Sequence, residues 1–163
     1  MNELKHEGIF IFTDGSVNTA TQVGYGACLI ITDLDLPISE LAQQIQVRKF
    51  EATSSTKLEL QLILWAFGQL DSFDRKCTFF TDSQNSVGLP QRRTKLEQAQ
   101  YRNKRNTVIH HHELYKAFYQ MMDACECSFV KVKGHQPKKQ KSPIEQIFTL
   151  VDRAARSAMR NQL

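Results

Sequence analysis

The chain has 163 residues, of which 41% are hydrophobic and 23% are charged, a balance that fits one globular domain over residues 1–163. Its formal net charge of +4 is a mild basic bias, which is compatible with a polyanionic partner. No apolar stretch is long enough to cross a bilayer, and the N-terminal segment lacks the apolar core of a signal peptide. We therefore expect a cytoplasmic protein that does not bind membranes, with a monomer as the default state.

Three strands are predicted in the first third of the chain. They cover residues 8–13, 25–32 and 43–50. A turn around Gly24, Tyr25 and Gly26 and another at residues 33–37 would connect them. Connections this short favour an antiparallel meander, because parallel neighbours need a long crossover.

A helix is predicted next, beginning at Ser54 or Ser55, either of which would cap it, and running to about residue 70. Leu58 and Leu62 belong to its apolar face, and Glu59 lies beside that face. A carboxylate at the edge of an apolar stripe is costly to bury without a partner, so Glu59 requires an explanation. A second short apolar run at residues 77–81 predicts another strand.

The second half of the chain is more basic. Residues 92–105 carry Arg92, Arg93, Lys95, Arg102, Lys104 and Arg105, which predicts a solvated helix or a protruding loop. A helix is expected at about residues 111–124 and a strand at 129–132. The last helix begins at Ser142 and Pro143, where serine is the cap and proline occupies the first turn. Asp152 falls among the apolar residues of that helix.

The four cysteines do not predict a zinc site. Cys125 and Cys127 are the only close pair, and the second pair that a structural zinc site needs is missing. The three histidines at 110–112 would complete such a site only by chance of folding, so we interpret them as a polar helix start.

Four acidic residues share an unusual placement. The tripeptide Phe-Thr-Asp occurs twice, so that Asp14 and Asp82 each follow a buried strand, while Glu59 and Asp152 lie on or beside apolar helix faces. Each alone has an ordinary structural explanation as a turn, a cap or an ion-pair partner. Together they would repel one another unless protons or a cation intervene. Mg²⁺ or Mn²⁺ prefers such hard oxygen ligands, so the four acids predict a divalent metal site.

The motifs around these acids occur in one order and resemble those of the type 1 ribonuclease H family. They are Phe-Thr-Asp-Gly-Ser at 12–16, Thr-Lys-Leu-Glu-Leu at 56–60, Thr-Asp-Ser-Gln at 81–84, Val-Lys-Gly-His at 132–135 and Val-Asp-Arg-Ala-Ala at 151–155. The resemblance implies an α/β ribonuclease H-like fold: a mixed five-stranded sheet, three antiparallel strands followed by parallel ones, flanked by helices.

The resemblance also implies a two-metal endonuclease that cuts the RNA strand of an RNA/DNA hybrid, with Mg²⁺, or alternatively Mn²⁺, as its cofactor. Asp14, Glu59, Asp82 and Asp152 match the family's metal-binding catalytic carboxylates. His135 matches the catalytic histidine that assists proton transfer or product release, and the near-neutral pKa of imidazole suits that role.

Substrate contacts are expected from small polar side chains near the acids, because a hybrid displays 2′-hydroxyls in a wide minor groove. The candidates are Gly15, Ser16, Asn18, Ser55, Thr56, Gln84 and Asn85, with Thr53 or Ser54 on a DNA-strand phosphate and Arg92 and Arg93 of the basic segment as further contacts. Two departures bear on affinity and selectivity. Residues 17–21 replace the Gly-Asn-Pro-Gly turn often found in the family, and Ser55 and Thr56 replace its pair of asparagines.

Two other functions are compatible with the same residues. One is a nuclease of this fold that acts on branched DNA or duplex RNA. The other is a non-catalytic module that binds hybrids, although such a module has no need for four acids that face a polyanion.

Overall fold

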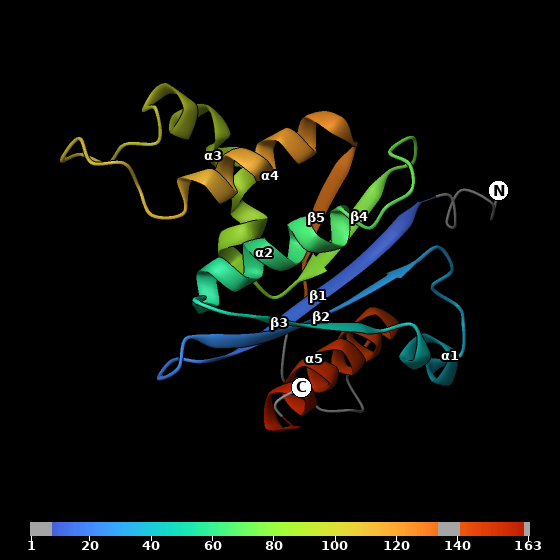
Figure 1. Ribbon diagram of the computed structural model, residues 1–163. Helices are drawn as coiled ribbons and strands as arrows, with labels where there is room; N and C mark the ends of the chain where they lie inside the picture. Colours follow the sequence, from blue (N-terminus) through green and yellow to red (C-terminus); the bar gives the residue numbers. More distant parts are fainter. Residues whose placement is uncertain (1–7, 134–140, 162–163) are drawn as a thin grey trace.

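The computed structural model describes residues 8–133 and 141–161. Five strands form one mixed sheet in the order β3-β2-β1-β4-β5, which confirms the predicted fold class (Figure 1). β1 pairs antiparallel with β2, and β2 with β3, whereas β4 runs parallel to β1 and β5 parallel to β4. The strands are β1 (Ile9–Asn18), β2 (Val23–Ile31), β3 (Gln46–Phe50), β4 (Cys77–Thr81) and β5 (Cys127–Lys131).

Helices cover both faces of this sheet. α2, α3 and α4 lie on one face, and α5 lies on the other with α1 beside it (Figure 1). Each face therefore has its own hydrophobic core, one shared with α2 to α4 and one with α5 and α1. None of the helices in the described part of the chain is long and apolar enough to cross a membrane. The helices are α1 (Ile38–Gln43), α2 (Ser55–Phe67), α3 (Gln84–Gln98), α4 (His112–Ala124) and α5 (Pro143–Asn161).

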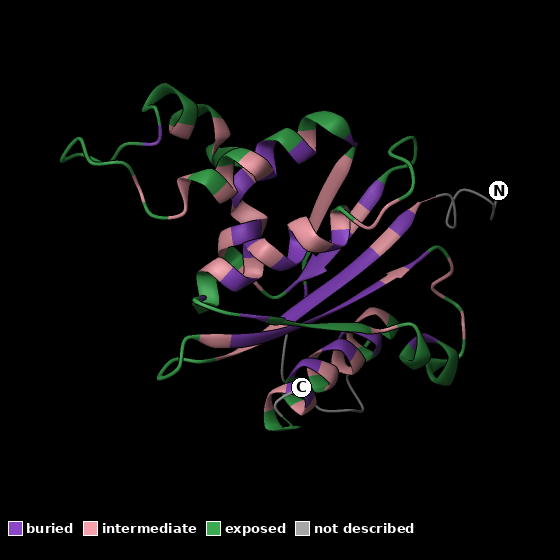
Figure 2. Cartoon of the chain, viewed as in Figure 1, coloured by how far each residue is buried: buried purple, intermediate pink, exposed green. Residues whose placement is uncertain are grey.

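The central strands β1 and β4 are apolar because helices cover them on both sides (Figure 2). Successive strand residues point to opposite faces, so Ile11 and Phe79 enter the core under α2 while Phe12 and Phe80 enter the core under α5. The rings of Phe12 and Phe80 stack with centroids 4.5 Å apart. This packing fixes β1 and β4 side by side at the point where both approach their acidic residues.

The predicted turn at Gly24, Tyr25 and Gly26 is wrong, because these residues lie inside β2. The connection between β1 and β2 is instead at residues 19–22, where Gln22 has a positive φ of 58°. The glycine at 26 serves a close approach rather than a turn. A Cβ atom there would overlap the side chain of Leu62 on α2.

The segment between β2 and β3 also differs from the prediction. The sequence predicts a turn at 33–37 and a strand from 43, but α1 occupies residues 38–43 and β3 begins at Gln46. This helix is only 6 residues long, has no side-chain cap and buries one residue, Leu41, in the α5 core. Because only one residue of α1 is buried, its sequence has no repeating apolar pattern from which a helix could be predicted.

The basic segment divides into a helix and a projecting loop. Residues up to 98 belong to α3, and residues 99–111 form what we call the basic hairpin, which extends away from the sheet (Figure 1). An antiparallel bridge joins Arg102 to Val108. The side chain of Asn103 accepts hydrogen bonds from the backbone N–H of Arg105 at 2.9 Å and of Thr107 at 3.0 Å. The hairpin therefore has a defined shape of its own.

Candidate functional site

Asp14 and Asp82 meet where the parallel half of the sheet ends. β1 and β4 pair from Ile9 and Cys77 to Phe12 and Phe80, and two more steps of that register would align Asp14 with Asp82. β1 does not stop at Asp14, as the sequence predicts, but continues along β2 to Asn18. Asp14 is therefore held in a continuous strand and is only 3% exposed.

Glu59 reaches the same place from α2. The side chain of Ser54 caps this helix by accepting a hydrogen bond of 3.3 Å from the backbone N–H of Lys57. The helix packs closely on the sheet because β1 and β2 present glycines opposite each other at 15 and 26. One carboxylate oxygen from each of Asp14, Glu59 and Asp82 lies within 4.8 Å of the other two.

Asp152 joins the cluster from α5, on the other face of the sheet. Its carboxyl group is hydrogen-bonded to that of Asp14, and it also forms an ion pair of 3.1 Å with Arg156 one turn later. A cavity of about 230 Å³ opens beside these acids. It is lined by Asp14, Gly15, Ser16, Asp82, Lys133, Lys141, Glu145, Phe148, Thr149, Asp152 and Arg156, and we call it the acidic cavity.

Two carboxyl groups of the cluster, those of Asp14 and Glu59, have raised pKa values. Burial is the largest cause that raises the pKa of Asp14, followed by its hydrogen bond with Asp152 and by repulsion from Asp82 and Glu59. Burial also raises the pKa of Glu59 to about 8, with a further contribution from the charge of Asp82, while a hydrogen bond with Thr81 acts in the opposite direction. Metal-free, these carboxyls share protons because they cannot all ionise together.

These residues fit a divalent cation. Glu59 keeps one buried oxygen, Oε2, without a hydrogen-bond partner, which is costly unless something else binds it. The ligand atoms in the cluster are carboxylate oxygens from three separate elements, and hard cations of the Mg²⁺ and Mn²⁺ type prefer such ligands. A cation here would stabilise the ionised carboxylates and satisfy that oxygen at once.

The predicted substrate residues fall into two groups. Gly15 and Ser16 line the acidic cavity, although the hydroxyl of Ser16 also lies 3.4 Å from the sulfur of Met159. Ser55, Thr56 and Gln84 are exposed at the first turns of α2 and α3; Glu59 follows the first two in α2, and Asp82 lies just before α3.

Asn18 lies apart from the acids. Its side chain accepts hydrogen bonds from the backbone N–H groups of Ala20 at 3.0 Å and Thr21 at 3.3 Å, so it shapes the β1–β2 turn. It lines a separate cavity of about 270 Å³ together with Tyr25 and Lys49.

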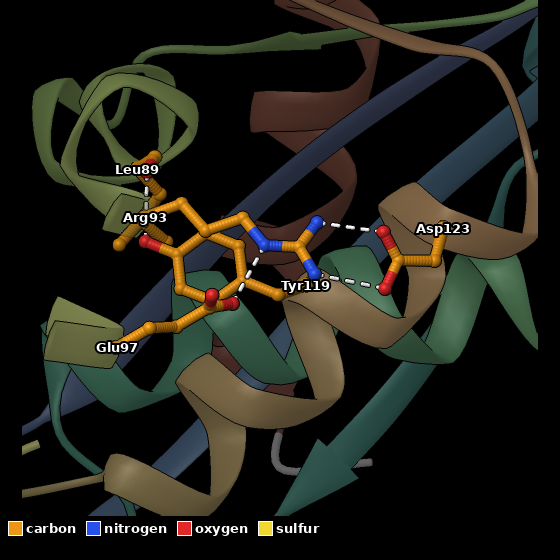
Figure 3. Close-up of polar contacts among 5 residues, drawn as sticks. All are labelled: Leu89, Arg93, Glu97, Tyr119 and Asp123. Atoms are coloured by element: carbon orange, nitrogen blue, oxygen red, sulfur yellow. Dashed lines mark hydrogen bonds and ion pairs between the residues drawn. The ribbon is translucent and has the colours of Figure 1, made fainter. Parts of the chain in front are cut away.

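Arg93 has partners within the protein (Figure 3). It forms two hydrogen bonds to Asp123 of α4, at 2.7 and 2.8 Å, and a third to Glu97 at 2.7 Å. Its guanidinium also lies over the ring of Tyr119, 5.2 Å from the centroid, and the hydroxyl of Tyr119 donates to the carbonyl of Leu89 at 2.7 Å. These contacts join α3 to α4, and we call them the α3–α4 clamp.

Arg92 is bonded to a predicted contact residue. Its guanidinium donates to the side-chain oxygen of Asn85 at 2.7 Å and to the backbone carbonyl of the same residue at 3.0 Å. The amide oxygen of Asn85 is thereby occupied, and its amide nitrogen is buried without a hydrogen-bond partner. Arg92 and Arg93 as direct substrate contacts stay predictions.

The remaining predictions have simple outcomes. His135 lies outside the described residues. In the described part of the chain, no cysteine belongs to a group of three or more metal-ligating side chains. The sequence did not predict that Cys125 lies against Cys77. Their sulfur atoms are 3.2 Å apart, and both residues are free thiols.

Sequence reasoning offered Arg156 only as one possible ion-pair partner of Asp152, which the structure confirms, and it did not place Thr149, Lys133 or Lys141 at the site. Thr149 and Arg156 lie three residues before and four after Asp152, which places all three on one face of α5. The spacing of these three residues could have predicted from the sequence that they share a helix face. Lys133 and Lys141 also line the cavity, and no local sequence pattern predicts that position.

Comparison with known proteins supports this picture of the chain. The sequence model of the RNase H family matches residues 6–160. A solved structure described as the foamy viral protease-reverse transcriptase in complex with dsDNA is similar in fold, with a TM-score of 0.69 at 10% sequence identity. The similarity covers 96% of this chain and 99% of that chain. Curated protein sequences gave no match.

Proposed function

Because the chain belongs to the RNase H family, we propose that it is a metal-dependent endonuclease that hydrolyses the RNA strand of RNA/DNA hybrids. The observation that carries this proposal is the carboxylate cluster, in which Glu59 has a buried oxygen without a partner and an elevated pKa. Acids in this state have little use in a module that only binds a polyanion. They suit a centre that exchanges protons for divalent cations.

Asp14, Glu59, Asp82 and Asp152 would hold the cations, which we propose are two Mg²⁺ ions, with Mn²⁺ as a substitute. When bound, such a pair supplies Lewis acidity for the attacking water and for the leaving 3′ oxygen. The protein's part is to fix the four carboxylates from β1, α2, α5 and the residue after β4 before substrate arrives. Rigid β1 and β4 set Asp14 and Asp82, while α2 and α5 bring the other two acids from opposite faces of the sheet.

Selection of the hybrid would come from the polar side chains around the acids. Gly15 and Ser16 line the acidic cavity, and Ser55, Thr56 and Gln84 are exposed at helix starts within four residues of Glu59 or Asp82 in the sequence. Hydroxyl and amide groups at these places suit the 2′-hydroxyls and base edges of a wide minor groove. His135 is proposed to move a proton near the leaving group, since an imidazole ordinarily has a pKa near neutral.

The basic hairpin is the proposed electrostatic contact to the rest of the duplex. Arg102, Lys104 and Arg105 are exposed on a loop with internal hydrogen bonds, which orders their positions. Cations on such a loop neutralise phosphates without reading sequence, so binding should weaken steeply as salt rises.

A substrate panel tests the proposal. The protein would be incubated with an end-labelled RNA strand annealed to DNA, and with duplex RNA, duplex DNA and branched DNA, in Mg²⁺, in Mn²⁺ and in EDTA. We expect cutting of the hybrid RNA strand alone, and only with metal. If the protein cut only duplex RNA or only branched DNA, that nucleic acid and not the hybrid would be its substrate. Tight hybrid binding with no cutting in either metal would identify a binding module instead.

A further inference from the structure

The acidic cavity contains cations as well as acids, and they are not equivalent. Arg156 forms an ion pair with Asp152, so its charge already has a carboxylate partner. Lys141 lines the same cavity, but the hydrogen-bond partner of its ammonium group is neutral: Nζ donates to the hydroxyl of Thr149 at 2.9 Å. In the part of the chain that the structure describes, no ion pair is recorded for Lys141. Its charge remains available to a ligand.

Lys141 is held in place at both ends. The hydroxyl of Thr149 donates to the carbonyl of Glu145 at 2.9 Å, which turns its lone pairs toward the ammonium group of Lys141. The carbonyl of Lys141 accepts a hydrogen bond of 3.2 Å from the side chain of Gln146. A long side chain ordered in this way has already lost part of the conformational entropy that binding would otherwise cost.

The start of α5 makes this arrangement rigid. The hydroxyl of Ser142 accepts from the backbone N–H of Glu145 at 3.2 Å and donates to the carboxylate of the same residue at 3.0 Å. Lys141 directly precedes this capped turn, and Asp152 lies further along the same helix. Lys141 and Asp152 are therefore both tied to α5.

We propose that Lys141 binds a phosphate of the strand that is cut, as a substrate-contacting residue positioned by Thr149. This inference rests on the proposed function. An ammonium group has three donors, and Thr149 uses only one of them. A phosphodiester that approaches four acids is repelled unless cations receive its oxygens, and an ordered, half-buried cation does this better than a solvated one.

The test is hybrid binding in Ca²⁺ in place of Mg²⁺, measured by fluorescence anisotropy over a series of salt concentrations. We expect Lys141→Gln to weaken binding on the order of 10-fold at low salt and to lower the log–log salt slope by about one phosphate contact. Lys141→Arg should restore the slope. Thr149→Val keeps the charge but removes its anchor, so it should weaken binding by about 3-fold and leave the slope unchanged.

Lys76→Gln is the matched control. It removes the same charge from an exposed residue that precedes β4, at the opposite end of that strand from Asp82. Equal affinity and equal salt slope in Lys141→Gln and Lys76→Gln would overturn the proposal. So would a loss in Lys141→Gln that Lys141→Arg fails to restore. Failure of the wild-type protein to cut hybrid in Mg²⁺ would contradict the proposed function instead, because the binding measurement does not depend on cleavage.

Discussion

At the scale of single residues, the site depends on Asp14, a carboxyl group that the fold keeps apart from water. Asp14 is almost inaccessible, is hydrogen-bonded to Asp152 and faces the charges of Asp82 and Glu59. A soluble protein keeps such a group only where its cost is offset, since replacing a buried polar cluster by apolar residues is often stabilising. Binding of a divalent cation offsets that cost.

Removing one acid should therefore separate activity from stability. We expect Asp14→Asn to lower hybrid cleavage by at least about 10³-fold, because one oxygen ligand is lost where charge develops. Measured at pH 7 or above without metal, the same change should raise the melting temperature, since wild type must take up a proton at position 14 on folding and asparagine need not. Cleavage and melting curves of the purified variant test both parts. Full activity in Asp14→Asn would contradict the assignment of this residue.

Glu59 predicts a pH dependence of stability. Its pKa is about 8 in the folded protein, against 4.5 for an ordinary glutamate. Between pH 4.5 and about pH 8, Glu59 is therefore protonated in the folded protein but not in the unfolded chain. The contribution of Glu59 to stability is complete below the unfolded pKa and is lost as pH rises through the folded pKa. In EDTA, the free energy of unfolding should fall by up to about 5 kcal/mol across this window, since each pKa unit corresponds to about 1.4 kcal/mol.

Denaturant titrations of wild type and Glu59→Gln across that pH range provide the measurement. The variant cannot titrate at position 59, so its stability should fall less steeply as pH rises. A steeper fall in Glu59→Gln than in wild type would show that the sign of this effect is wrong.

At the scale of elements, close contact between α2 and the sheet determines where Glu59 lies. Gly15 and Gly26 are cross-strand neighbours on β1 and β2, and a Cβ atom at either would press on Leu58 or Leu62 of α2. The glycines therefore set the distance between the helix and the strands.

We expect Gly26→Ala to destabilise the fold by about 1–3 kcal/mol, because Leu62 must move within a packed core. It should also weaken metal binding, because α2 carries Glu59. Gly88→Ala is the control, since the nearest atom to a Cβ there is 4.0 Å away and alanine favours the helix. Denaturant unfolding and Mn²⁺ titration of both variants give the comparison. Equal stability and metal affinity in the two variants would contradict the role given to Gly26.

The α3–α4 clamp supports the element that leads into the basic hairpin. If Arg93 acts by joining the helices, then Arg93→Gln and Asp123→Asn should change hybrid affinity in the same direction and by similar factors. If Arg93 instead contacts the substrate directly, only Arg93→Gln should weaken binding, and release of the guanidinium in Asp123→Asn should strengthen it. Our account predicts the first outcome. Anisotropy titrations of the two variants distinguish them.

At the scale of the whole molecule, the sequence was informative where burial was strong. The runs at 9–13 and 77–81 are apolar because both faces of β1 and β4 are covered, and this predicted their central place and the meeting of Asp14 with Asp82. Ser54 and Ser142 predicted two helix starts through their capping chemistry. These are local properties that an amino-acid pattern records directly.

The sequence was less informative where tertiary contacts decide the outcome. The sequence predicts a turn at Gly24 and Gly26, yet both residues lie in β2. The glycine at 26 is needed because Leu62 of α2 leaves no room for a side chain there. The helix α1 buries a single residue and so lacks a periodic pattern. Lys141 lines the acidic cavity because α5 packs against the sheet, and no local sequence pattern predicts that packing.

The central claim is that the four acids form a divalent metal centre, and calorimetric titration with Mn²⁺ at pH 7 tests it most directly. Because the pKa values of Asp14 and Glu59 are raised, binding must release protons, and the measured heat should change with the ionisation enthalpy of the buffer. The account predicts saturable binding with net proton release in wild type, and much weaker binding in Asp14→Asn. No binding by wild-type protein, or binding that Asp14→Asn leaves unchanged, would contradict it.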